Sequence, residues 1–160
     1  MTIILKQDHD ALRAMMHDFA HVLRTRGSDA LPDIARRRIS FSQLFRQHMG
    51  REDARALDLR NGRQAAQADP VLREHGRAIR ILFLRYSDHI KYWTPTVIKG
   101  SWDDYLAAVL VLQGELADRM AWEERCLYPL IDAQPRGAVS NGVQKGPPIG
   151  VEEGPPFQII

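Results

Sequence analysis

Apolar side chains recur at steps of three and four residues along most of the chain, which is the spacing of one buried face on an α-helix. Four such stripes can be separated. They predict helices over about 2–26, 32–61, 70–93 and 101–132.

Residues that cap or break helices mark the expected boundaries. Gly27 is expected to cap the first helix, Pro32 to lie in the first turn of the second, Asp69 and Pro70 to begin the third, and a capping box at Ser101 to begin the fourth. No segment alternates between apolar and polar residues over the length of a strand. The sequence therefore predicts an all-α fold, an antiparallel up-down-up-down four-helix bundle over residues 1–134.

The last part of the chain has a different composition. Residues 135–160 contain five of the nine prolines and five of the eleven glycines, with no sustained helical or strand period. This segment is predicted to be a flexible, disordered C-terminal tail, with docking onto a protein partner as the alternative.

Every apolar stripe is interrupted by polar residues that stay in register with it. A polar side chain that faces a bundle core costs free energy unless something satisfies it. The interruptions are His9 in the first stripe, His48 and Glu52 in the second, His75 in the third, and Arg119 and Glu123 in the fourth.

These interruptions are expected to meet in space. Two positions on antiparallel helices lie at one level when they are equidistant from the turn between the helices. The midpoint of positions 9 and 48 is 28.5, that of 52 and 75 is 63.5, and that of 75 and 119 is 97, and each falls in a predicted connection. Inward imidazoles and carboxylates at one level are what a metal site in a bundle core requires.

The spacing of these residues also repeats. His9 is followed 39 residues later by a His-x-x-x-Glu pair, and His75 is followed 44 residues later by a pair in which Arg119 stands where histidine is expected. Members of such a pair, four residues apart, lie on one face of a helix. The chain therefore resembles two helical hairpins of one plan.

This pattern resembles the hemerythrin-like, or HHE, cation-binding domains, which are four-helix bundles that hold a non-haem, usually di-iron, centre. The matching runs are Asp8-His9-Asp-Ala-Leu, His48-Met-Gly-Arg-Glu52-Asp53, Glu74-His75 and Trp122-Glu-Glu-Arg-Cys-Leu-Tyr-Pro129. The resemblance covers roughly residues 3–132. It implies that His9, His48 and His75 are nitrogen ligands, and that Glu52 and Glu123 are bridging or chelating carboxylates.

Arg119 departs from the family pattern, because a guanidinium stays protonated and offers no lone pair to a metal. Three interpretations remain open. The site holds one metal through the three histidines and a carboxylate, it holds two metals with water in place of the missing ligand, or Arg119 pairs with Glu52 or Glu123 in a metal-free bundle. Imidazole with carboxylate suits iron or manganese and, less selectively, zinc.

The resemblance implies a protein that senses or handles iron, oxygen, peroxide or nitric oxide. No acid–base pair or nucleophile is apparent outside the residues that interrupt the stripes, so binding is favoured over turnover. Weak di-iron oxidase or peroxidase chemistry is the enzymatic option. A metal-free interaction or regulatory module is the alternative function.

The composition of the chain limits its expected cellular location and its expected partners. A single cysteine excludes a disulfide framework and fits a cytoplasmic location. The 22 basic and 20 acidic residues form no concentrated basic block, and no apolar run reaches the length of a membrane helix, so neither nucleic acid nor a membrane is an expected partner.

Overall fold

The computed structural model describes residues 2–134, and within that range it is helical with no strand. The elements in chain order are α1 (Ile3–Arg26), the 3-10 turn η1 (Gly27–Ala30), α2 (Leu31–Asn61), α3 (Ala65–Tyr92), α4 (Pro95–Gly100), α5 (Trp102–Trp122), the π-helical turn η2 (Glu123–Leu127) and α6 (Tyr128–Asp132). The predicted all-helical class is therefore confirmed.

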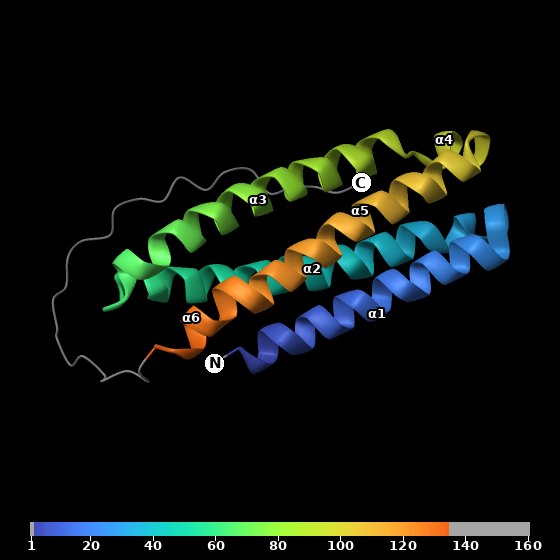
Figure 1. The fold of residues 1–160 in the computed structure, drawn as a ribbon. Coiled ribbons are helices and arrows are strands. Elements are labelled where there is room, and N and C mark those ends of the chain that lie inside the picture. Colours follow the sequence, from blue (N-terminus) through green and yellow to red (C-terminus); the bar gives the residue numbers. More distant parts are fainter. Residues whose placement is uncertain (1, 135–160) are drawn as a thin grey trace, which may run out of the picture.

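Four long helical rods lie side by side (Figure 1). The first three are α1, α2 and α3, and the fourth is the continuous run of α5, η2 and α6. Both α1 and α3 pack against α2 and α5, and α2 also contacts α6 at the end of the fourth rod. The start of the first rod is tied to the end of the fourth, since the backbone N–H of Thr2 donates to Asp132 Oδ1 at 2.9 Å and the Thr2 hydroxyl donates to Oδ2 at 2.7 Å.

Two of the predicted boundaries are confirmed. Gly27 follows α1 with a φ of 54°, the left-handed region that favours glycine, and its N–H bonds to the carbonyl of Leu23. Pro32 lies in the first turn of α2, where its missing N–H leaves no helical bond unmade.

The predicted start of the third helix is wrong. α3 begins at Ala65, so that Pro70 lies inside it and only residues 62–64 separate it from α2. The alanines of this first turn favour a helix strongly, and Ala68 is fully buried in the core. That burial outweighs the one backbone hydrogen bond that Pro70 cannot make.

The connection between the last two rods also differs from the prediction. It contains the short helix α4, whose N-cap residue Thr94 accepts a hydrogen bond from the backbone N–H of Val97. Ser101 precedes α5, but its side chain makes no capping hydrogen bond, so the predicted capping box is not formed.

Two apolar clusters of the core enclose the polar layer, the level of the bundle that contains His9, His48, Glu52, His75, Arg119 and Glu123. One contains Leu5, Ala56, Leu59, Ala68, Leu72, Leu127, Tyr128 and Ile131, and the other contains Leu12, Met16, Phe45, Leu82, Leu116 and Met120. On each helix the polar residues fall between members of these two sets. Apolar side chains therefore close the layer from above and below, which keeps its local dielectric low.

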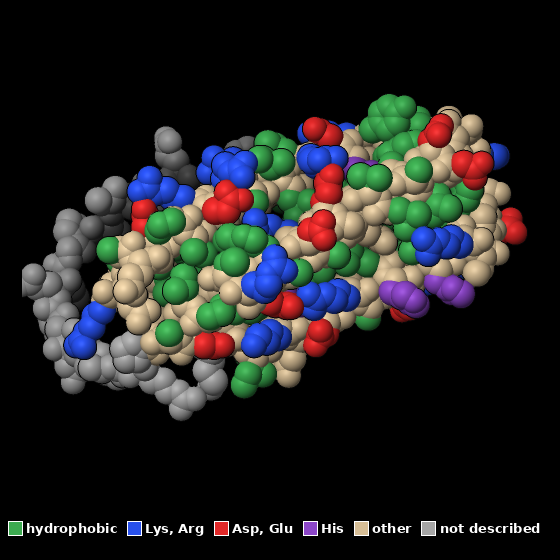
Figure 2. All heavy atoms as spheres, in the orientation of Figure 1, with side chains coloured by type: hydrophobic (Ala, Val, Ile, Leu, Met, Phe, Trp, Pro, Cys, Tyr) green, Lys and Arg blue, Asp and Glu red, His purple; other side chains and the backbone are tan. Residues whose placement is uncertain are grey.

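The surface carries acidic and basic side chains that are interspersed over the face seen in Figure 2. Across residues 2–134, none of the helices combines the length and the hydropathy needed to cross a membrane. The predicted C-terminal tail, residues 135–160, lies outside the described residues.

Candidate metal centre

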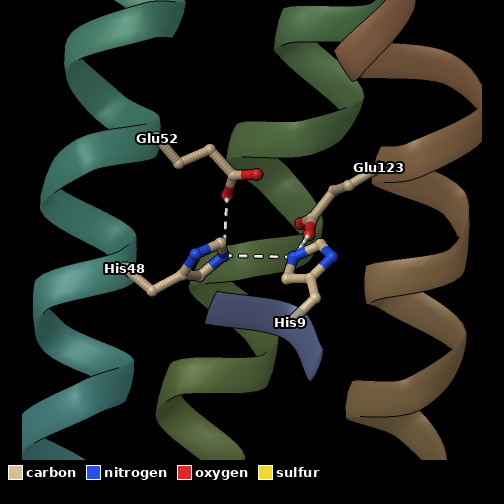
Figure 3. A group of neighbouring side chains, drawn as sticks. All are labelled: His9, His48, Glu52 and Glu123. Atoms are coloured by element: carbon tan, nitrogen blue, oxygen red, sulfur yellow. Dashed lines mark hydrogen bonds and ion pairs between the residues drawn. The ribbon is translucent and has the colours of Figure 1, made fainter. Parts of the chain in front are cut away.

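Four polar side chains from three rods converge in the middle of the bundle. His9 comes from α1, His48 and Glu52 from α2, and Glu123 from the first residue of η2. One nitrogen or oxygen atom from each lies within 4.8 Å of the others, and the side chains point toward a common centre (Figure 3). The four residues are between 0% and 2% exposed. This buried group can hold a metal ion.

The distances within the group suit ligands of one ion. His9 Nε2 lies 3.2 Å from His48 Nε2 and 3.4 Å from Glu123 Oε2, and His48 Nε2 lies 3.8 Å from Glu52 Oε2. Atoms that bind one metal at about 2.1 Å in tetrahedral or octahedral geometry are about 3.0–3.4 Å apart. Small side-chain adjustments would therefore bring all four onto one ion.

Both histidines have a carboxylate behind the ring. His9 Nδ1 lies 2.7 Å from Glu124 Oε1, and His48 Nδ1 lies 3.4 Å from Asp8 Oδ2. An Nδ1–H that donates to such a carboxylate leaves Nε2 with the lone pair that a metal needs. Metal-binding histidines are oriented in this way in known sites.

Arginines hold these two carboxylates in turn. Arg51 donates to both oxygens of Asp8, at 2.9 and 2.8 Å, and Arg13 Nη2 donates to Glu124 Oε1 at 2.8 Å. Although burial alone would raise the pKa of Glu124, hydrogen bonds from His9 and Arg13 hold it below its usual value. Asp8 and Glu124 therefore form an outer layer, held in place by arginines, that fixes the orientation of both rings.

The Nε2 atoms of His9 and His48 face each other inside the group. Burial, together with the nearby His9, lowers the pKa of His48, so this ring is neutral at physiological pH. The Nε2 atoms of the two rings lie 3.2 Å apart. A metal ion held between them would use the Nε2 lone pair of each ring.

The two inner carboxylates differ from each other. Burial, and then the charge of Glu123, raises the pKa of Glu52 to about 8. Burial also opposes ionisation of Glu123, but hydrogen bonds from His75 and His9 outweigh it and lower the pKa of Glu123 to about 2. Neither oxygen of Glu52 has a hydrogen-bond partner among the described residues. A buried carboxylate whose oxygens are not taken up by hydrogen bonds is suited to bind a cation.

His75 lies beside the four-residue group rather than within it. Its Nε2 is 3.5 Å from Glu52 Oε2 and its Nδ1 is 3.2 Å from Glu123 Oε1. The ring is buried and bridges the two inner carboxylates. The structure thus brings all three predicted histidines into the layer, but it gives His75 a different place from the other two.

Arg119 fills the position where the family pattern places histidine. Its Nε donates to Glu123 Oε1 at 3.2 Å, its Nη1 lies 4.0 Å from Glu74 Oε1, and its guanidinium carbon lies 3.7 Å from the centre of the Trp122 ring. The side chain is buried, so its charge acts on Glu123 with little screening. The guanidinium thereby occupies part of the layer with a fixed positive charge.

Sequence reasoning missed Tyr128, whose hydroxyl lies 2.9 Å from His9 Nε2. The π-helical turn is what brings it there, because the N–H of Tyr128 bonds to the carbonyl of Glu123 five residues earlier. Burial, with the charges of Glu52 and Glu123, raises the pKa of Tyr128, so the phenol keeps its proton. The available signal was the Leu-Tyr-Pro run after the acidic pair on the fourth rod.

The other three histidines do not join the layer. His17 and His21 are exposed on α1, as their positions off the apolar stripe predict. His89 is half-buried, its ring stacked 5.8 Å from that of Tyr105, and burial lowers its pKa to about 4. The free Cys126 is half-buried and takes no part in the layer.

No protein-family model matches the chain, and comparison with curated proteins and with solved structures found no match either.

Proposed function

We propose that this chain is a hemerythrin-like protein, an antiparallel four-helix bundle that holds one non-haem iron and senses or handles iron, oxygen or reactive small oxidants. The facing Nε2 atoms of His9 and His48 carry the proposal. Each ring has a carboxylate beside its Nδ1, and the two Nε2 atoms lie 3.2 Å apart. Glu52 and Glu123 complete a set of two nitrogen and two carboxylate donors, which suits iron.

A single metal fits the layer better than two. The second half of the repeat offers His75 and Arg119, and the arginine adds a buried positive charge where a second cation would lie. Two cations beside a guanidinium in a low-dielectric layer would repel one another strongly. The buried charge of Arg119 therefore favours the mononuclear interpretation among those left open by the sequence.

The protein's own residues would prepare the site for its ligand. Asp8 and Glu124 fix the two rings, so little orientation is lost when the ion binds. Tyr128 holds a proton at its hydroxyl oxygen beside His9, and the apolar clusters on both sides of the layer exclude bulk water. Ferrous iron, when bound, supplies a redox-active centre with affinity for dioxygen, peroxide or nitric oxide.

Metal analysis tests the proposal directly. Protein purified without chelator or histidine tag is reconstituted anaerobically with ferrous, manganous or zinc ion, and bound metal is counted by mass spectrometry after desalting. We expect about one iron per chain and a rise in melting temperature, because a ligand that binds only the folded state stabilises it. Iron below about 0.2 per chain would contradict the proposal.

Matched variants separate the site from adventitious binding. His48→Ala is expected to abolish both the bound iron and the rise in melting temperature, whereas His17→Ala, which removes an exposed histidine of α1, is expected to change neither. Equal loss in both variants would place the metal elsewhere. Full occupancy by manganese or zinc but not iron would keep the site and overturn the choice of metal.

The second candidate is a metal-free bundle that serves as an interaction or regulatory module. The ion pair between Arg119 and Glu123 favours it, since the guanidinium already neutralises one inner carboxylate. This alternative predicts a melting temperature that neither metal nor chelator changes. The reconstitution experiment therefore distinguishes the two candidates.

A further inference from the structure

The bundle contains a cavity of about 290 Å³ on the opposite side of the Phe45 and Leu116 side chains from the polar layer. Its walls come from all four rods and are largely apolar. They include Phe19 from α1, Phe41 and Phe45 from α2, Leu82 from α3, and Leu112 and Leu116 from α5. Apolar walls with a few polar groups are typical of small-molecule sites.

The cavity opens between α1 and α2. The exposed residues that line it are Asp18 on the first of these helices and Arg36 and Ser40 on the second. Asp18 lies 3.7 Å from His17, and Arg36 donates to Asp33. A molecule that enters between these helices therefore passes a mouth of mixed polarity.

Two further arginines line the cavity, Arg37 and Arg38, and neither has an acidic partner among residues 2–134. Within residues 2–134, Arg37 forms no hydrogen bond or ion pair, and Arg38 donates only to neutral groups, the carbonyl of Trp93 at 2.9 Å and the hydroxyl of Tyr105 at 3.3 Å. The Nε atom of each is buried and has no hydrogen-bond partner. A guanidinium charge without a counter-ion is costly in a partly buried place.

We propose that this cavity binds a small amphipathic organic anion, a medium-chain or aryl-substituted carboxylate, with its carboxylate on Arg37 and its apolar body among the aromatic and aliphatic walls. A carboxylate accepts from the two-pronged face of a guanidinium in a bidentate pair, which supplies the missing acceptors and the missing negative charge. The single acidic residue of the lining, Asp18, is exposed and next to His17, so it does not cancel this preference.

The volume limits the size of the ligand. A dry cavity of about 150 Å³ lined by apolar side chains holds benzene, which has six heavy atoms. A cavity of about 290 Å³ is therefore suited to a ligand of about ten to twelve heavy atoms, which octanoate matches.

Titration calorimetry with three probes of one length tests the inference. The full chain, kept in chelator so that metal plays no part, is titrated with octanoate, octan-1-ol and octylamine. We expect octanoate to saturate at one per chain and to bind at least about tenfold more tightly than the alcohol, the effect of a charge-assisted hydrogen bond. Equal affinity for octanoate and octanol, preference for the amine, or no saturable binding would each overturn the proposal.

Variants test where in the cavity the carboxylate and the apolar body of the ligand bind. Arg37→Gln is expected to reduce octanoate affinity to that of octanol, whereas Arg46→Gln, an exposed arginine of the same helix outside the cavity, is expected to change nothing. Leu112→Trp fills the cavity and is expected to abolish binding of both probes, with Leu82→Phe as a second filling variant should the first not fold. Octanoate binding that survives in a folded filled variant would place the ligand elsewhere and overturn the assignment.

Discussion

The two halves of the polar layer follow one sequence plan but differ in what stands behind each ring. In the first half, His9 and His48 turn Nε2 inward and rest Nδ1 on a carboxylate. In the second half, His75 turns both nitrogens toward the inner carboxylates. Whether a histidine of this layer can bind a metal therefore depends on the carboxylate behind its ring as much as on its being a histidine.

The outer partners show where the repeat has diverged. Asp8 precedes the first histidine and lies behind His48, and Glu74 precedes the second histidine and lies 4.0 Å from Arg119. Both halves keep an acidic residue before the histidine, but in the second half this residue, Glu74, faces the guanidinium of Arg119. Asp53, which matches Glu124 in the repeat, is exposed and forms no hydrogen bond or ion pair with His75 in the described part of the chain.

The largest expected effect comes from the carboxylate that both halves share. Glu123→Gln leaves the buried Arg119 without its ionic partner, so we expect the metal-free protein to lose about 3 kcal/mol of unfolding free energy. Urea denaturation in chelator measures it. Asp118→Asn removes one exposed negative charge from the same rod and should cost less than about 0.5 kcal/mol. A loss below about 1 kcal/mol for the Glu123 variant would show that the two halves are not coupled through this residue.

The outer acids give a direct test of the asymmetry. Asp8→Asn should weaken iron binding about 10–100-fold, because His48 loses the acceptor that orients its ring. Glu74→Gln, the same change at the matching position of the second half, should leave iron affinity within about threefold. Competition with a chelator of known affinity measures both. Equal weakening in the two variants would mean that the metal is shared by both halves.

Arg119→His should have the smallest effect on the first ion and add a weak second one. The new imidazole would have Glu74 behind it, but His75 would still lack an outer carboxylate, so we expect a second iron bound at least about tenfold more weakly than the first. Metal counts over a range of free iron measure it, with Arg119→Met as the control that removes charge without adding a ligand. Two ions of equal affinity, or no second ion at all, would contradict this account.

The helical class and the meeting of the polar residues follow from local patterns, and both could be predicted. The three hairpin midpoints place five side chains at one level, and the contacts of His9 with His48 and of Glu52 with His75 agree. The start of α3 was harder to predict from the sequence. Asp69 and Pro70 resemble a helix start, but the burial of Ala68 extends the helix past them, and burial is a tertiary effect.

The inner arrangement of the site was not predictable from spacing. In a regular α-helix, a residue five positions after Glu123 lies about 140° around the axis and would point away from the layer. Tyr128 reaches His9 because the helix widens into a π turn, which the apolar stripe does not reveal. The different place of His75 likewise depends on side-chain rotation, which residue spacing does not determine.

The π turn at Glu123–Leu127 has a consequence for insertions and deletions in the fourth rod. A turn with a bond from residue i+5 to residue i contains one residue more than an α turn while pointing the same way at its end. Removing Cys126, which takes no part in the layer, would let the turn close as ordinary α-helix with the tyrosine still facing inward. A deletion of one residue anywhere in α5 would instead rotate the rest of the rod by about 100° and scatter the layer. The fourth rod therefore contains one residue more than a regular α-helix would need to keep the same direction, and this residue lies in the turn beside the site.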